Sequence, residues 1–147
     1  MSLADAIAAG ARSESEVWAS ALVDVPAWEP VFSPLAPEHL ALGLETVYEA
    51  YLVHYGRPRL FAAPDQDEAI LLGDYLYAHG LVRVAEAGGV PAVAVLAELI
   101  AGCAALRADG ADGDGDAWIA AARALGGDPD DDAIARALAL HSDRVAP

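Results

Sequence analysis

Three aspartates in the stretch DGADGDGD have the spacing of calcium ligands. Asp112, Asp114 and Asp116 fall at positions 1, 3 and 5 of an EF-hand-like loop, where carboxylate oxygens bind the ion. The register then fails, because position 6 is Ala117 where the turn needs glycine, and position 12 is Arg123 where a bidentate glutamate should close the shell. We therefore interpret residues 109–116 as a solvated, acidic, glycine-rich loop.

A second acidic cluster, DPDDD at residues 128–132, is typical of a helix start. Asp128 suits the N-cap and Pro129 suits the first helical position. The three aspartates that follow would face the positive end of the helix dipole. This structural interpretation is favoured over an aspartate-rich metal motif.

The nucleophiles and imidazoles do not form a site in the sequence. Cys103 lies in an apolar run without a neighbouring base, which is typical of a buried cysteine. The histidines have no spacing typical of zinc ligands. They are His39, His54, His79 and His141.

Two short motifs in the middle of the chain stand at a spacing typical of one protein family. Gly56-Arg57-Pro58 has the form G-x-P, and Gly73-Asp74-Tyr75-Leu76 begins seventeen positions after Gly56. The pair resembles the R-R-G-x-P and G-D-Y-L motifs of the trans-isoprenyl diphosphate synthases, and the resemblance covers residues 37–107. It implies a helical bundle like the N-terminal half of the isoprenoid synthase fold. Gly56, Gly73 and Asp74 become scaffold positions in it, with Asp74 hydrogen-bonded inside the core.

The positions that bind metal in that family are altered in this chain. The resemblance places the family's D-D-x-x-D motif on ETVYE, residues 45–49, and its two arginines on His54 and Tyr55. In the family this motif holds magnesium ions that bridge an allylic diphosphate. Glu45 and Glu49 share one helix face, but with Thr46 between them they form a poorer cage. We expect a solvated acidic face there, the alternative being a vestigial or partner-completed metal site, and we assign no catalytic residue and no metal ligand.

Other diphosphate contacts of the family are missing as well. The chain has no lysine, and it ends before a second aspartate motif. His54, Tyr55, Arg57 and Arg59 remain as possible diphosphate or interface contacts. For the two arginines a surface or interface role is favoured.

A half-length relative with these losses resembles the small subunits of heteromeric hexaprenyl and heptaprenyl diphosphate synthases. The resemblance implies a non-catalytic subunit that binds a full-length polyprenyl diphosphate synthase, contacts the prenyl chain and influences the length of a product used for quinone side chains. It implies that magnesium is bound by the catalytic partner and that this chain has no cofactor of its own. Whether this chain has enzymatic activity without the partner is left open. The alternative is a stand-alone helical homodimer that binds an apolar ligand or a protein partner.

Charge and hydropathy limit the other partners. The chain of 147 residues has 23 acidic and 8 basic residues and a formal net charge of -15, which would repel nucleic acid and anionic membranes. The start, MSLADAIAAGARSESE, lacks the pattern of a signal peptide, so we expect a cytoplasmic protein. The most apolar segment, residues 90–106, carries Glu98 near its centre. This favours a buried helix over stable insertion in a membrane.

Hydrophobic periodicity and turn residues predict one all-α domain over residues 1–147. A capping box of Ser13 and Glu16 predicts the first helix. Residues 26–37 contain four prolines and are predicted to form an extended connector at the surface. Residues 88–91, GGVP, predict the end of one long helix and the start of the next. The predicted helices after the connector cover residues 37–55, 66–86, 91–107, 116–125 and the segment from 128.

Overall fold

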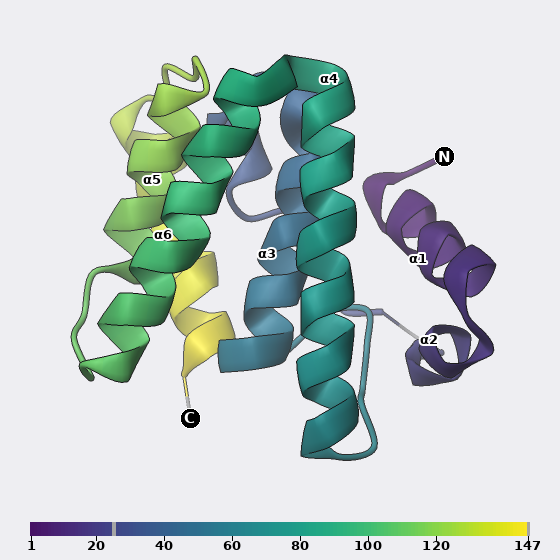
Figure 1. Cartoon of the computed structure of the whole chain (residues 1–147). Coiled ribbons are helices and arrows are strands. Elements are labelled where there is room, and N and C mark those ends of the chain that lie inside the picture. The colour runs from purple at the N-terminus through teal and green to yellow at the C-terminus, as the bar shows by residue number, and fades with distance from the viewer. Residues whose placement is uncertain (25, 147) are drawn as a thin grey trace.

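A computed structural model describes residues 1–24 and 26–146 of the chain, and its regular structure is helical (Figure 1). The α-helices are α1 (Leu3–Glu14), α2 (Glu16–Ala21), α3 (Ala41–Tyr55), α4 (Gln66–Ala108), α5 (Asp114–Ala124) and α6 (Asp131–Val145). Two short 3-10 helices, η1 (Ser33–Leu35) and η2 (Glu38–Leu40), precede α3. Within the described residues the only strand-like pairing is one isolated bridge between Leu22 and Phe61. The prediction of an all-α fold is confirmed.

The centre of the bundle is α3. All its residues from 43 to 52 are buried. One hydrophobic cluster, which includes Phe32 and Trp118, connects α3 to α5 and α6, and a second one, which includes Ile7 and Leu72, connects it to α1 and the start of α4. Figure 1 shows α1 and α2 on one side of the molecule and α5 and α6 on the other. A charged residue in the middle of α3 therefore needs a partner inside the protein.

The long helix α4 consists of two arms that meet at Gly89. This glycine has φ 71° and ψ -169°, which is outside the helical region, and Pro91 follows it in the first turn of the second arm. The second arm then turns back and runs obliquely away from the first, along α5 and α6 (Figure 1). The predicted helix end and restart at residues 88–91 are confirmed. We call residues 66–88 the first arm and residues 90–108 the second arm.

Two glycines let α3 and the first arm of α4 touch through their backbones. A Cβ on Gly43 would lie 2.4 Å from Val84 Cγ2 and 3.1 Å from the Val84 backbone nitrogen. A Cβ on Gly80 would lie 2.6 Å from Val47 Cγ2 and 3.0 Å from the Val47 backbone nitrogen. This close crossing fixes how far apart the two longest central helices lie.

The connector of residues 26–37 is not the extended surface segment that its prolines predict. It contains η1, and its side chains Val31, Phe32 and Leu35 are buried in the core. Proline prevents a long helix but does not prevent burial, because backbone N–H groups can find acceptors outside regular structure. The connector therefore packs against the first half of α3.

The helix predicted before VWASALV is present as α2, but its predicted cap, Ser13, is wrong, and the helix α1 that precedes it was not predicted. The segment before Ser13 is already helical, because Ser2 and Asp5 form the capping box of α1. Ser15, rather than Ser13, caps the next helix by accepting a hydrogen bond from the Val17 N–H. Alternating serines and acids in this stretch offer several capping registers, and the pattern alone does not select one.

The starts of the last two helices are also shifted from the prediction. The N-cap of α6 is Asp130, whose side chain accepts from the Ala133 N–H, and not Asp128. The preceding helix α5 begins at Asp114 instead of Asp116. By contrast, the predicted end of α3 is confirmed, with Gly56 as its C-cap.

Substitution of Gly80 by alanine tests the helix crossing. We expect Gly80→Ala to lower the free energy of unfolding by about 1–3 kcal/mol, because the added methyl group meets backbone atoms that cannot yield. Gly102→Ala is the control, since a Cβ there meets nothing within 4 Å. The control should gain up to about 1 kcal/mol from helix propensity. Urea unfolding measures the free energy of unfolding of both variants. If Gly80→Ala and Gly102→Ala changed it equally, the close helix crossing would be contradicted.

Candidate functional site

Glu45, Glu49 and Arg59 form a buried ion-pair network beneath the connector. Arg59 Nη1 donates to Glu45 Oε1 at 2.6 Å, and Arg59 Nε donates to Glu49 Oε1 at 2.9 Å. The side chains of all three residues are 0% exposed. The predicted solvated acidic face is wrong, and so is the surface role that was favoured for Arg59.

Backbone N–H groups bind the remaining carboxylate oxygens of this network. Glu45 Oε2 accepts from the N–H of Val31 at 3.1 Å and of Ser33 at 2.9 Å. Glu49 Oε2 accepts from the N–H of Arg59 at 2.9 Å and of Leu60 at 2.8 Å. The two carboxylates therefore attach the connector and the segment after α3 to the central helix.

The guanidinium of Arg59 is enclosed by further acceptors and by aromatic rings. It donates to the backbone oxygens of Glu29 at 2.9 Å and Glu45 at 3.3 Å. Its central carbon lies 4.2 Å from the centre of the Trp28 ring and 5.1 Å from that of Tyr48. Burial lowers the pKa of Arg59, but the adjacent carboxylates outweigh it and raise the pKa overall. The cation that pairs with the two acids is thus a permanent part of the chain.

Thr46, at the second position of ETVYE, is buried but belongs to another set of contacts. Its hydroxyl donates to the Leu42 carbonyl at 2.7 Å and accepts from Arg83 Nη1 at 3.1 Å. Among the described residues, no three His, Cys, Asp or Glu side chains lie where they could hold a metal ion together. The three motif positions therefore do not converge on one site.

Asp74 and Gly73 differ in how they fit their predicted scaffold role. The Asp74 side chain is 67% exposed and lies 3.4 Å from His54 Nε2, so the predicted hydrogen bond inside the core is wrong. Gly73 is buried, and a Cβ there would lie 2.4 Å from His54 Nε2. The glycine makes room for the His54 ring, which stacks on Tyr77 with ring centres 5.2 Å apart.

Arg57 joins the end of α3 to the end of α6. Its N–H donates to the Arg144 carbonyl at 2.9 Å, and its half-exposed side chain donates to the Asp143 carbonyl. Tyr55 is half-buried, with the Arg107 guanidinium carbon 5.4 Å from its ring centre. A role of Arg57, Tyr55 or His54 toward diphosphate or an interface stays a prediction.

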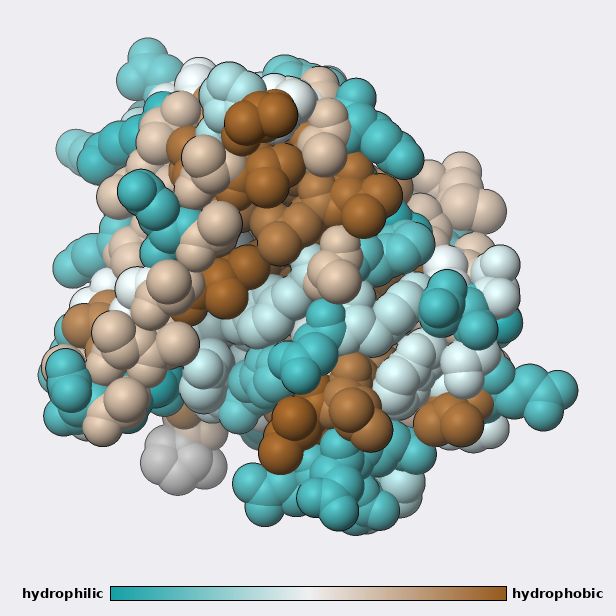
Figure 2. Space-filling view, viewed as in Figure 1, coloured by the Kyte–Doolittle hydropathy of each residue, from teal (hydrophilic) through white to brown (hydrophobic). Residues whose placement is uncertain are grey.

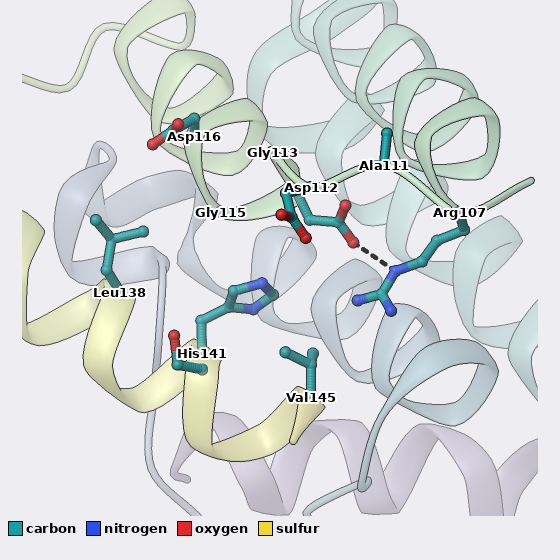
Figure 3. Close-up of a pocket in the computed structure, with 11 residues that line it drawn as sticks. Arg107, Ala111, Asp112, Gly113, Gly115, Asp116, Leu138, His141 and Val145 are labelled. Carbon is teal, nitrogen blue, oxygen red and sulfur yellow. Dashed lines mark hydrogen bonds and ion pairs between the residues drawn. The ribbon is translucent and has the colours of Figure 1, made fainter. Parts of the chain in front are cut away.

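A polar pocket of about 410 Å³ lies between the first turn of α5, the end of α4 and α6 (Figure 3). Asp114 reaches it from the α5 start and accepts from Arg107 Nε at 2.7 Å and from the Tyr51 hydroxyl. Arg107 Nη2 also donates to the Tyr51 oxygen at 2.6 Å. Asp114 is buried, while Asp112 and Asp116 are exposed. The prediction of a solvated loop therefore holds for those two acids and is wrong for Asp114.

His141 forms the floor of this pocket and is neutral near neutral pH. Tyr48 Oη lies 2.7 Å from His141 Nδ1. Burial lowers the pKa of His141 to about 4 and raises that of Tyr48, so near neutral pH the ring is uncharged and the phenol keeps its proton. Local sequence patterns could not find this pair, because its members are 93 residues apart.

The outward side of the second arm of α4 is apolar and exposed. We call it the outer face; its residues are Val90, Pro91, Ala94, Ala97, Glu98, Ala101, Gly102, Ala104, Ala105 and Ala108. Glu98 is its only charged member. Figure 2 shows hydrophobic side chains gathered over α4. The predicted burial of this segment is wrong for its outer face.

Two further features describe this region. By length and composition alone, α4 is long and apolar enough to cross a membrane, and 22% of its most apolar window is buried. A groove of about 300 Å³ separates the second arm from α5. Leu99, Ala121 and Gly102 are among its mostly small and apolar lining residues.

No family model, no curated protein and no solved structure matches this chain. The resemblance to the trans-isoprenyl diphosphate synthases rests on the motif residues and their spacing.

Replacing Arg59 tests whether the network needs its internal cation. We expect Arg59→Met to lower the free energy of unfolding by about 3–5 kcal/mol, because two buried carboxylates lose their counter-charge. Arg57→Met, two positions earlier and exposed, should cost at most about 1 kcal/mol. Urea unfolding compares the two. Partial recovery in Arg59→Met/Glu45→Gln/Glu49→Gln would confirm the charge mechanism, and equal losses in the two single variants would contradict it.

The depressed pKa of His141 predicts a stability that falls in acid. The unfolded chain binds a proton at this ring below pH 6.5 and the folded chain only below about pH 4, so the contribution is complete above 6.5 and is lost between 6.5 and 4. Over this range, the contribution of His141 changes the free energy of unfolding by up to about 1.4 kcal/mol per pH unit. His141→Gln should flatten the stability profile over this range, whereas the exposed-site variant His39→Gln should not. Parallel profiles for His141→Gln and the unsubstituted chain would contradict the assignment.

Proposed function

We propose that this protein is the non-catalytic small subunit of a heteromeric long-chain polyprenyl diphosphate synthase. In this role it binds a full-length catalytic subunit and influences the chain length of the product. The observation that carries the proposal is the Arg59 network. Glu45 and Glu49 occupy the positions that the family resemblance assigns to metal-binding aspartates, and Arg59 pairs with both of them inside the core.

The network argues against prenyl transfer by this chain alone. Magnesium could reach Glu45 and Glu49 only after Arg59 left them and the backbone N–H donors of the connector were released. A magnesium ion also keeps several waters, for which a fully buried site has no room. In the proposed complex, magnesium and the allylic diphosphate are therefore bound by the catalytic subunit.

The outer face of α4 is the proposed docking surface. Its alanines and Gly102 allow a partner helix to approach closely, and an exposed apolar surface of this kind is typical of an interaction site. A second copy of the chain is disfavoured as occupant, because each copy carries a formal net charge of -15. A less acidic partner with basic residues near Glu98 and Asp109 would fit better. The groove beside Leu99 and Ala121 is the proposed contact for the prenyl chain.

Co-expression with the full-length polyprenyl diphosphate synthase of the same genome tests the proposal. We expect a complex in size-exclusion chromatography with light scattering, and products of altered chain length compared with the catalytic chain alone. Ala101→Glu/Ala105→Glu should weaken binding by about tenfold or more, because binding would bury two unpaired charges. Ala135→Glu/Ala139→Glu, on exposed positions of α6, is the matched control.

The same experiment can refute each part of the proposal. No complex and unchanged products would rule out the subunit role, and a homodimer through α4 that ignores the synthase would favour the alternative function. Magnesium-dependent prenyl transfer by the purified chain alone would contradict its non-catalytic character. We expect no such activity in millimolar magnesium chloride, because the carboxylates of Glu45 and Glu49 are already bound by Arg59 and by backbone N–H groups.

A further inference from the structure

We infer that the groove between the second arm of α4 and α5 receives a helix of the catalytic partner. This helix directs a basic side chain toward Glu98 and an acidic side chain toward Arg123. The partner is the one named in the proposed function, on which this inference rests. The outer face of α4 indicates that a partner binds, whereas the groove and its two flanking charges indicate which kind of element binds and in which direction.

The groove runs between two antiparallel helices. Pro91 and Val95, at the start of the second arm, lie beside Ala124 and Leu125, at the end of α5. The two helices therefore run in opposite directions next to each other (Figure 1). The groove between them has a volume of about 300 Å³. Two neighbouring helices with a groove between them form a surface on which the side chains of a third helix can pack.

Short side chains line the groove. Ala117, Ala120 and Ala124 stand on the α5 side, and Gly102 stands on the α4 side. A Cβ added to Gly102 would meet nothing within 4 Å, so no other described part of the chain covers the groove there. The distance between packed helices depends on the side chains at the contact. A helix that docks here can therefore bring its backbone close to both α4 and α5.

One acid and one base without partners flank the groove. Glu98 is the only charged residue of its lining, and Arg123 lies three positions after Ala120 on the exposed side of α5. Glu98 and Arg123 are both exposed, and neither forms an ion pair with another described residue. The α4 side of the groove therefore carries an available negative charge, and the α5 side an available positive charge.

These two charges specify the chemistry of the occupant. A helix in the groove turns one flank toward α4 and the other toward α5, as the e and g flanks of a coiled-coil helix face their neighbours. Charge complementarity requires lysine or arginine on the flank near Glu98, and aspartate or glutamate on the flank near Arg123. Reversing the helix would exchange its flanks and bring like charges together. The groove therefore accepts such a helix in one direction, and the helix forms the outer wall of the groove.

Exchanging the two charges tests the inference at constant net charge. In the complex with the full-length polyprenyl diphosphate synthase of the same genome, we expect Glu98→Arg/Arg123→Glu to raise the Kd about tenfold or more, because each flank of the partner helix then meets a like charge. Arg12→Glu/Glu14→Arg is the matched control. It exchanges the same charges at exposed positions of α1, on the other side of the molecule, and should leave the Kd unchanged. Isothermal titration calorimetry measures the Kd, and circular dichroism verifies that both variants are folded.

Photo-crosslinking identifies the docked element directly. With p-benzoylphenylalanine in place of Ala120, we expect a cross-link to a helix of the synthase that has basic and acidic side chains on opposite flanks of an apolar stripe. The same photoreactive residue in place of Ala135, at an exposed position of α6, should give no such cross-link. Mass spectrometry of the digested complex maps the cross-linked peptides.

The outcomes distinguish this inference from the proposed function. If the complex forms but both exchange variants bind alike, or if position 120 cross-links to a segment that is not such a helix, the inference is overturned and the subunit role stands. If the unsubstituted chain forms no complex, the subunit role and the inference both fail. Weaker binding of the Glu98 and Arg123 exchange variant alone supports both.

Discussion

The interaction on which the rest of the structure depends is the burial of one guanidinium between two carboxylates. Arg59 contacts Glu45 and Glu49, and the same carboxylates accept N–H groups from the connector and from residues 59 and 60. Removing the Arg59 charge would leave both carboxylates without a counter-charge inside the protein, whereas removing one carboxylate would leave a one-to-one ion pair. A buried ion pair adds little net stability over an apolar replacement, so its main contribution here is to fix which backbone segments lie against α3.

The position of the pocket follows from that network. With the connector held by Glu45, its Phe32 ring stacks on Trp118 of α5 at 5.3 Å and meets the edge of Tyr48 at 5.2 Å. Tyr48 in turn holds His141 of α6. The next turn of α3 supplies Tyr51, which contacts Asp114 and Arg107 at the pocket entrance. The central helix α3 therefore positions two polar clusters. One is the buried ion-pair network of Arg59, and the other is the set of contacts between Tyr51, Asp114 and Arg107 at the solvent-open pocket.

Sequence patterns predicted the features that depend on local backbone chemistry. The bend of α4 follows from Gly89 and Pro91, and the end of α3 follows from Gly56, because these residues restrict the backbone wherever they occur. The ion-pair network of Glu45, Glu49 and Arg59 depends on contacts between separate segments of the chain. The spacing of residues within one helix does not reveal such contacts. Glu45 and Glu49 have the spacing of an exposed acidic face, yet α3 is apolar on every side, and such a helix is buried. That contrast was the available signal that the two acids need an internal cation.

The use of arginine inside the protein also explains its surface. Six of the eight arginines, Arg57, Arg59, Arg83, Arg107, Arg136 and Arg144, donate to groups of the chain itself. Few cations are left to balance the exposed acids, so most of the surface repels copies of the same chain. The outer face of α4 is different, because its only charge is Glu98. Apolar attraction can exceed charge repulsion there, and a partner that also supplies basic residues gains from both effects.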